Sequence, residues 1–206
     1  MSNFEYLKGI TNFKELYDYC LTSEQFVLTR PDISASYCRK ALEYTVKTIY
    51  LLKLGSVPAG SLFELVDNFI FSSFVSDSDT LASLHFIRRI GNNAIHNQKV
   101  TKRQSIACLE NLHFFIGEVL VQLGEIKQYE SFNKEILGQE NQTLKVLTNE
   151  EVVVPETIIN DYNDKIKKDT TLKITRSMPE AETRKLYIDT WLNEAGWEVL
   201  ETKNVI

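Results

Sequence analysis

Hydrophobic residues in the first 127 positions recur at intervals of three and four, the spacing that places them on one face of an α-helix. The strongest run lies between Pro31 and Gly55, residue types that favour the first turn and the end of a helix. Its apolar-face positions are Cys38, Leu42, Thr45, Ile49 and Leu52. The pattern predicts one long helix between the proline and the glycine.

Four further helices are predicted in the same stretch. One covers residues 13–29, and a short one follows Ser61, which has capping-box spacing with Glu64 and precedes an apolar pattern that continues to Phe69. Asp77 caps a helix over residues 81–95, and Thr101 opens another that carries a narrow apolar seam to residue 123. Residues 1–127 are therefore expected to form an all-α bundle of about five helices, the last two antiparallel.

The composition of the sequence changes after residue 127. Residues 128–178 are mostly polar and predict a linker with one charged helix over residues 155–168. Residues 179–206 have the pattern of a helix followed by a strand, which cannot bury their apolar faces alone. We interpret them as the start of an incomplete α/β domain, so the chain as a whole is expected to be mainly α.

Composition places the chain among globular proteins, with 206 residues, 43% of them hydrophobic and 25% charged. A net charge of -5 argues against coating nucleic acid by bulk electrostatics, so phosphate contact requires a local basic patch. The start of the chain lacks signal-peptide features, and a cytoplasmic protein without membrane contact is expected. The three cysteines lack metal-ligand spacing and are expected to be buried free thiols, with no metal site: Cys20, Cys38 and Cys108.

Candidate chemistry concentrates near the end of the helix predicted over residues 81–95. Arg89, Asn93 and His96 have spacings that place them on one stripe, in a stretch without Asp or Glu. Guanidinium and ammonium groups segregated in this way favour a phosphate anion. The candidate phosphate-binding residues are Arg88, Arg89, Asn93, His96, Lys99, Lys102 and Arg103.

Two interpretations of this stripe stay open at the level of sequence. An Arg that holds phosphate and a His that transfers a proton suffice for metal-free RNA cleavage by the ribose 2′-hydroxyl. Alternatively, Asn92, Asn93, His96 and Asn97 only terminate the helix, with His96 bonded to a nearby carbonyl.

Two segments resemble known families. Residues 39–47 (RKALEYTVK), residues 90–97 (IGNNAIHN) and the helix predicted over residues 109–123 resemble a domain of unknown function in the HEPN (higher eukaryote and prokaryote nucleotide-binding) superfamily. Residues 180–199 (EAETRKLYIDTWLNEAGWEV) are similar to the entry into the nuclease domain of type I restriction enzyme R subunits. The two segments occur fused in this order at the front of many R subunits and related helicase-nucleases.

The first resemblance implies a HEPN-like bundle whose relatives use an Arg and a His, a few residues apart, as an RNase motif completed by dimerisation. Arg89 and His96 match that motif at its longest spacing, and they would be the catalytic pair. Ile90 stands where active members commonly have a polar residue. The resemblance therefore favours an interaction and regulatory module over a metal-independent RNase, and it implies a homodimer.

The second resemblance implies a parent protein that is an ATP-dependent, site-specific deoxyribonuclease. Glu182 and Arg184 would lie at the start of its nuclease domain, of which this chain lacks the metal-binding and motor motifs. No cofactor is expected in the chain itself, and Mg²⁺ and ATP are expected only in the full-length relative. The expected partners are DNA or RNA and the modification and specificity subunits of a restriction complex.

Overall fold

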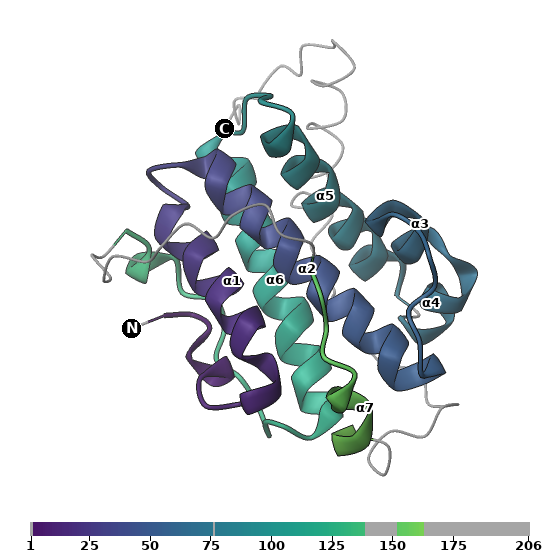
Figure 1. The fold of residues 1–206 in the computed structure, drawn as a ribbon. Helices are drawn as coiled ribbons and strands as arrows, with labels where there is room; N and C mark the ends of the chain where they lie inside the picture. The colour runs from purple at the N-terminus through teal and green to yellow at the C-terminus, as the bar shows by residue number, and fades with distance from the viewer. Residues whose placement is uncertain (1, 76, 139–151, 163–206) are drawn as a thin grey trace, which may run out of the picture. The chain divides into compact units, whose positions relative to one another are not determined.

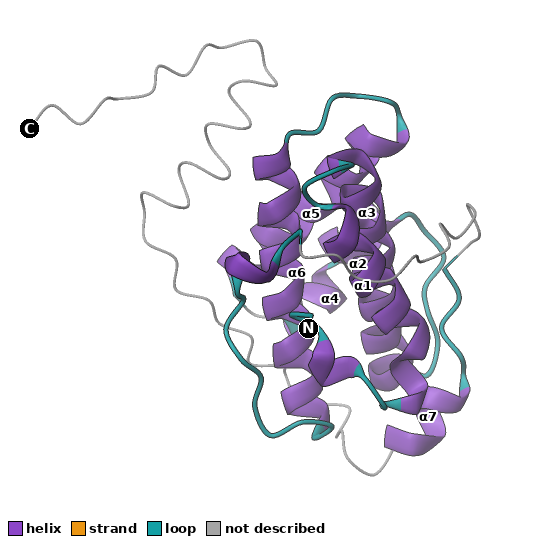
Figure 2. Cartoon of the chain, turned by 90° about the vertical axis from the view of Figure 1, so that its left-hand side faces the viewer, coloured by secondary structure: helices purple, strands orange, loops and turns teal. Residues whose placement is uncertain are grey.

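The computed structural model describes residues 2–75, 77–138 and 152–162 (Figure 1). All regular secondary structure in these residues is helical, which confirms a mainly α protein (Figure 2). Short 3-10 helices lie at η1 (Glu5–Leu7), η2 (Thr11–Phe13) and η3 (Lys134–Ile136). The α-helices are α1 (Lys14–Phe26), α2 (Pro31–Leu54), α3 (Leu62–Asp67), α4 (Phe69–Phe74), α5 (Ser78–Ile95), α6 (Lys102–Leu123) and α7 (Thr157–Tyr162).

Local signals set the ends of the two longest helices, and those at Pro31, Gly55 and Thr101 were predicted. Pro31 occupies the first turn of α2, and Gly55 ends that helix in the left-handed conformation with a φ of 75°. Thr101 and Gln104 form a capping box at the start of α6, and Gly124 ends it with a φ of 73°.

The helix predicted after Ser61 is two helices, which corrects the sequence prediction. Asn68 between α3 and α4 has an extended backbone, and its side chain accepts a 2.9 Å hydrogen bond from the Ile70 N–H, which caps α4. This break changes the phase of the apolar pattern. Phe69, predicted to continue the buried face of α3, is 78% exposed.

α2 is the centre of the bundle and packs against α1, α5 and α6 (Figure 1). α5 and α6 are joined by residues 96–101 and contact each other, and a connection this short makes them antiparallel. α6 is long and apolar enough to cross a bilayer by length and composition, but 67% of its most apolar stretch is buried inside the bundle. That burial is typical of the core helix of a soluble protein.

The three cysteines come together from different helices. Cys20 on α1, Cys38 on α2 and Cys108 on α6 are all free and buried, as predicted. Burial raises the pKa of each thiol, that of Cys38 to about 12. These thiols therefore stay protonated and form part of the core.

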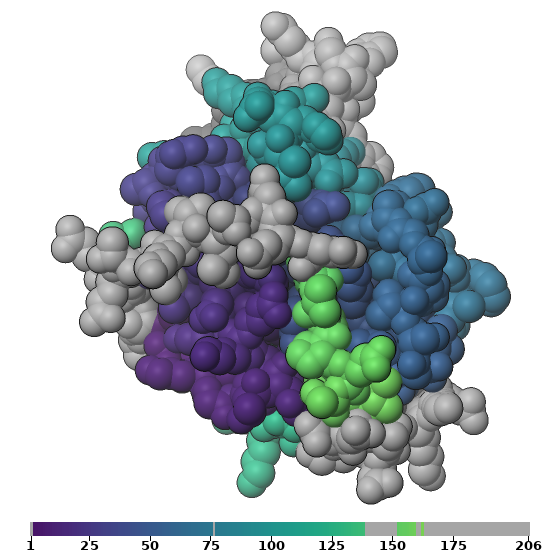
Figure 3. All heavy atoms as spheres, in the orientation of Figure 1, coloured from purple at the N-terminus to yellow at the C-terminus, as the bar shows by residue number. Residues whose placement is uncertain are grey.

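The helical unit continues beyond residue 127, where the sequence suggested a boundary. Tyr129 and Phe132, from the predicted linker, place their rings edge-on against the buried His113, with centroids 5.5 Å away in each case. Ile158 and Tyr162 are also buried, and residues 152–162 lie between the N-terminal segment and the α3–α4 region (Figure 3). Part of the predicted linker thus belongs to the core.

The other sequence predictions for the C-terminal part of the chain fall on residues that the structure does not describe. They comprise the remainder of the linker, the rest of the charged helix, and the start of an α/β domain with Glu182 and Arg184.

Candidate nucleic-acid interface

α5 positions the central residues of the candidate site. The helix has Asp77 as its N-cap, and the Asp77 carboxylate accepts a 2.8 Å hydrogen bond from the Thr80 N–H. Its buried face contains Leu84, Ile87, Ile90 and Gly91. Arg88 and Arg89 flank that face and are half-buried, so their guanidinium groups lie at the edge of the core.

The end of α5 is formed by the backbone around Asn97. This residue has a φ of 58°, and the Gln98 N–H donates a 2.8 Å hydrogen bond to the Asn93 carbonyl, which together with the Asn97 N–H to Ala94 bond makes a Schellman motif. Asn97 therefore has the helix-ending role considered above. The His96 side chain is exposed and makes no hydrogen bond within the described residues, so it is not needed for that role.

Arg89, Asn93 and His96 lie on the same side of α5. His96 lies seven positions after Arg89, which places their Cα atoms about 10 Å apart along the helix axis, two turns from one another. Arg89 and Asn93 are half-buried, and His96 is exposed. The stripe thus runs from the edge of the core to solvent.

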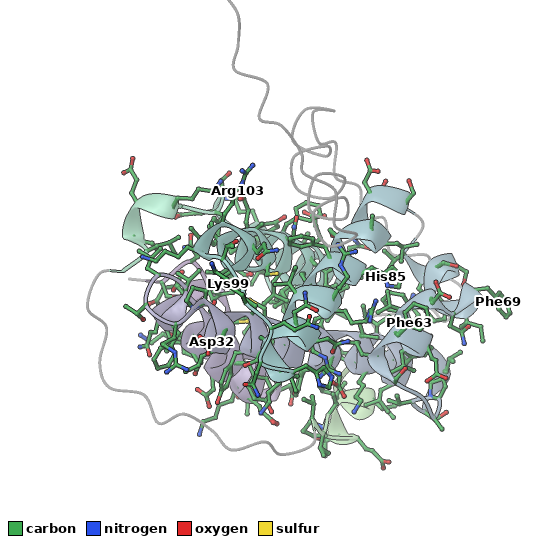
Figure 4. All side chains as sticks on the ribbon, turned by 90° about the horizontal axis from the view of Figure 1, so that it is seen from above. Asp32, Phe63, Phe69, His85, Lys99 and Arg103 are labelled. Carbon is green, nitrogen blue, oxygen red and sulfur yellow. The ribbon has the colours of Figure 1, made fainter. Side chains whose placement is uncertain are left out.

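The other predicted basic residues gather beyond the end of α5. Lys99, Lys102 and Arg103 are all exposed, and no acidic residue lies in the first turn of α6. In Figure 4, Lys99 and Arg103 lie toward one side of the view. Together with the positive end of the α6 dipole, these side chains form a surface that favours anions. We call these residues, together with His96, the basic end.

The structure adds Arg39 of α2 to the two arginines of α5. The Cβ that Gly91 lacks would lie only 2.5 Å from the Cβ of Arg39, so the missing side chain is what admits Arg39 to this place. Burial first, and then the charges of Arg89 and Arg39, lower the pKa of Arg88. We call Arg39, Arg88 and Arg89 the arginine cluster.

Two carboxylates act on Arg39 and Arg88 within the described residues, those of Glu43 and Asp67. Glu43 lies 3.4 Å from the Nη1 of Arg39, but it also forms a 3.0 Å ion pair with Lys47. The Nε–H groups of Arg39 and Arg88 are buried and lack a hydrogen-bond partner within the described residues. Arg39 and Arg88 therefore each retain an available donor.

An aromatic ring of α3 lies next to the arginine cluster. The Arg88 guanidinium carbon lies 4.9 Å from the ring centroid of Phe63, an arrangement of the cation–π type. The His85 ring lies 5.8 Å from Phe63, and its Nε2 is 3.8 Å from the Asp67 carboxylate. Burial and the Arg88 charge lower the pKa of His85, although Asp67 acts in the opposite direction.

Sequence reasoning singled out the α5 residues but not Arg39 or Phe63 as site residues. A signal was present for Arg39, because a glycine inside a helix often marks a close approach of another element. Phe63 had no such signal, since its contact with Arg88 depends on how α3 packs on α5.

No protein-family model, curated protein or solved structure matches this chain. The site is therefore interpreted from its chemistry. It offers guanidinium groups, an exposed imidazole and helix N–H donors, and no group of three metal-ligating side chains occurs within the described residues. Groups of these chemical types are suited to contact with phosphate, and an imidazole is also capable of proton transfer.

Proposed function

We propose that the helical unit is an interaction and regulatory module that binds nucleic-acid phosphates through the arginine cluster and the basic end. The observation that carries the proposal is the convergence of Arg39 from α2 with Arg88 and Arg89 from α5, in a chain whose net charge is -5.

Physical chemistry supports this proposal. Three guanidinium groups at the edge of a core repel one another, and partial burial makes this arrangement less favourable still. A phosphate would relieve the repulsion and accept the available donors, because a guanidinium matches two phosphate oxygens. An exposed basic end on the same helix would hold a neighbouring phosphate of the same strand.

The test is fluorescence anisotropy with labelled oligonucleotides. Replacing Arg39 or Arg88 with Gln should weaken binding roughly five- to tenfold and reduce the slope of log affinity against log salt by about 1. Arg30→Gln is the matched control, because Arg30 is exposed and pairs with Asp32 at 2.8 Å. Equal effects of all three changes would mean that only net charge matters and would refute a specific site.

The sequence resemblance supports a larger setting for this module. We propose a HEPN-like bundle within a type I restriction R subunit, or a related cytoplasmic defence helicase-nuclease, followed by a nuclease domain. Mg²⁺ and ATP would then serve other parts of the protein, and modification and specificity subunits would be its partners. We expect the full-length protein to co-purify with these subunits. If the full-length protein were consistently recovered without them, that result would count against this setting.

One observation favours a second function, metal-independent RNase activity of a dimer. The His96 imidazole is exposed and makes no hydrogen bond within the described residues, on the same side of α5 as Arg89. Incubation of the chain with RNA and a chelator tests it. Cleavage that leaves 2′,3′-cyclic phosphate ends, and that is lost in Arg89→Ala and His96→Ala, would establish RNase activity. Intact RNA would refute this second function and leave the binding function as the proposal.

A further inference from the structure

We infer that Phe63 and Arg88 together bind an unpaired base and its adjoining phosphate, which makes the module selective for single-stranded nucleic acid. This inference rests on the proposed function and names the form of nucleic acid that the same surface accepts.

The position of Phe63 is set by α3, and not by a need to fill the core. A capping box of Ser61 and Glu64 begins this helix, and Leu62 and Leu65 bury its inner face. Phe63 points outward and is 46% exposed. A large aromatic ring that is left half in solvent beside an arginine is chemically suited to stacking.

Arg88 is held by the aromatic ring and not by a carboxylate. Its guanidinium carbon lies 4.9 Å from the Phe63 centroid, and it forms no ion pair within the described residues. The Asp67 carboxylate acts electrostatically on Arg88 without forming an ion pair with it, and its Oδ1 lies 3.8 Å from the Nε2 of His85. The ring thus orients the guanidinium while leaving its charge and hydrogen-bonding edge for a phosphate.

These contacts discriminate between single and double strands. An unpaired base can stack on the free part of the Phe63 ring while its phosphate contacts Arg88, and every base has a π-face, so no sequence preference is required. In a duplex the faces of the bases are covered by stacking on one another, so the ring gains no stacking contact with a base. In Figure 4, Phe63 and His85 lie on the same side of the view, away from Lys99 and Arg103, so a strand that contacted both surfaces would extend across the α5 face.

Anisotropy with the full chain tests the inference, using unpaired strands of about 12 nucleotides and duplexes of the same sequence. We expect Phe63→Leu to reduce affinity for the unpaired strand about tenfold, because a base-stacking contact is lost, and to reduce duplex affinity much less, because there only the orientation of Arg88 is affected. Phe63→Tyr should retain the preference. Phe69→Leu is the matched control, because Phe69 is 78% exposed on α4.

The outcomes separate this inference from the proposed function. Absence of binding to either form, or unchanged binding after Arg39→Gln and Arg88→Gln, would refute the proposed function itself. Arginine-dependent binding with equal losses on strand and duplex in Phe63→Leu, or equal effects of Phe63→Leu and Phe69→Leu, would overturn only the stacking site. RNA and DNA strands are compared in parallel, and similar affinities are expected because base and phosphate are common to both.

A spectroscopic readout covers the case in which Phe63→Leu folds poorly. In Phe63→Trp, the new indole fluorescence, corrected for the signal of the natural chain, should be quenched by the unpaired strand and not by the duplex. Quenching by neither, in a variant that still binds the strand, would overturn the stacking site.

Discussion

Gly91 of α5 and Arg39 of α2 are in such close contact that a Cβ on the glycine would lie 2.5 Å from the Cβ of the arginine. The same hypothetical atom would lie 3.0 Å from the carbonyl oxygen of Ala35. The two helices therefore meet backbone to backbone at this point. The contact brings an arginine of one helix to the arginine pair of the other, and it ties the candidate site to the packing of the core.

Gly91→Ala should lower both stability and affinity for nucleic acid. The added methyl group must push α2 from α5, which costs about 1–3 kcal/mol of unfolding free energy by overpacking and displaces Arg39. Gly117→Ala on α6 is a matched control, because its Cβ would meet the Tyr129 ring at 2.7 Å, away from the arginine cluster. Urea unfolding and anisotropy check the prediction, and equal losses of affinity in both variants would contradict it.

A multivalent anion should stabilise the fold through the arginine cluster. Pyrophosphate at about 100 times its dissociation constant adds about 2.7 kcal/mol of stability, which raises the melting temperature by several degrees. Arg88→Gln should lose most of this shift without lowering the melting temperature in chloride, because removing a like charge relieves repulsion. A thermal melt at matched ionic strength measures both effects, and a shift retained in Arg88→Gln would contradict the assignment.

His85 should make the fold less stable at mildly acidic pH. Burial and the Arg88 charge lower the folded-state pKa of His85 below its ordinary value of 6.5, so the unfolded chain binds the proton first as the pH falls. The protein is therefore most stable above the unfolded-state pKa of His85. Its stability declines as the pH falls below that pKa, and the decline ends below the folded-state pKa. Wild-type protein should therefore lose more unfolding free energy than His85→Gln between about pH 7.5 and 5. Parallel pH profiles of the two proteins would contradict this assignment.

Asn97 and His96 should differ in what their replacement does. Alanine tolerates a positive φ less well than asparagine does, so Asn97→Ala should lower the unfolding free energy by about 1 kcal/mol. Asn97→Gly should leave it unchanged or raise it slightly. His96→Ala should change stability by less than about 0.5 kcal/mol, since its side chain is exposed. Thermal or urea unfolding measures these changes, and a large loss in His96→Ala would assign His96 to the helix end.

A chain that ends at residue 127 should be less stable than one that ends at residue 162. It lacks Tyr129 and Phe132, which cover His113, and Tyr162, whose ring lies 6.3 Å from that of Phe13. Loss of the buried Tyr162 and of the half-buried Tyr129 and Phe132 should cost about 3 kcal/mol or more. Circular dichroism during urea unfolding measures the difference, and identical midpoints would show that residues beyond 127 are not part of the stable unit.

Much of the secondary structure follows from signals that act within one helical turn. The start and end of α2 follow from Pro31 and Gly55, and the capping boxes at Ser61 and Thr101 join residues only three positions apart. Such contacts depend on neighbouring residues alone, so they can be predicted from the sequence. The buried free cysteines were also predictable, from their apolar neighbours and unsuitable spacing. The break at Asn68 escaped prediction because the apolar pattern runs through it.

Tertiary structure alone decided which distant residues share a surface. The spacing of Arg88, Arg89 and His96 was enough to place them along one helix and its end, because it fixes their directions around the axis. It did not determine that Arg39 joins them or that Phe63 lies under Arg88, because both contacts depend on how close one helix approaches another. That approach is set by the combined packing of many side chains, a property that no short segment of sequence contains.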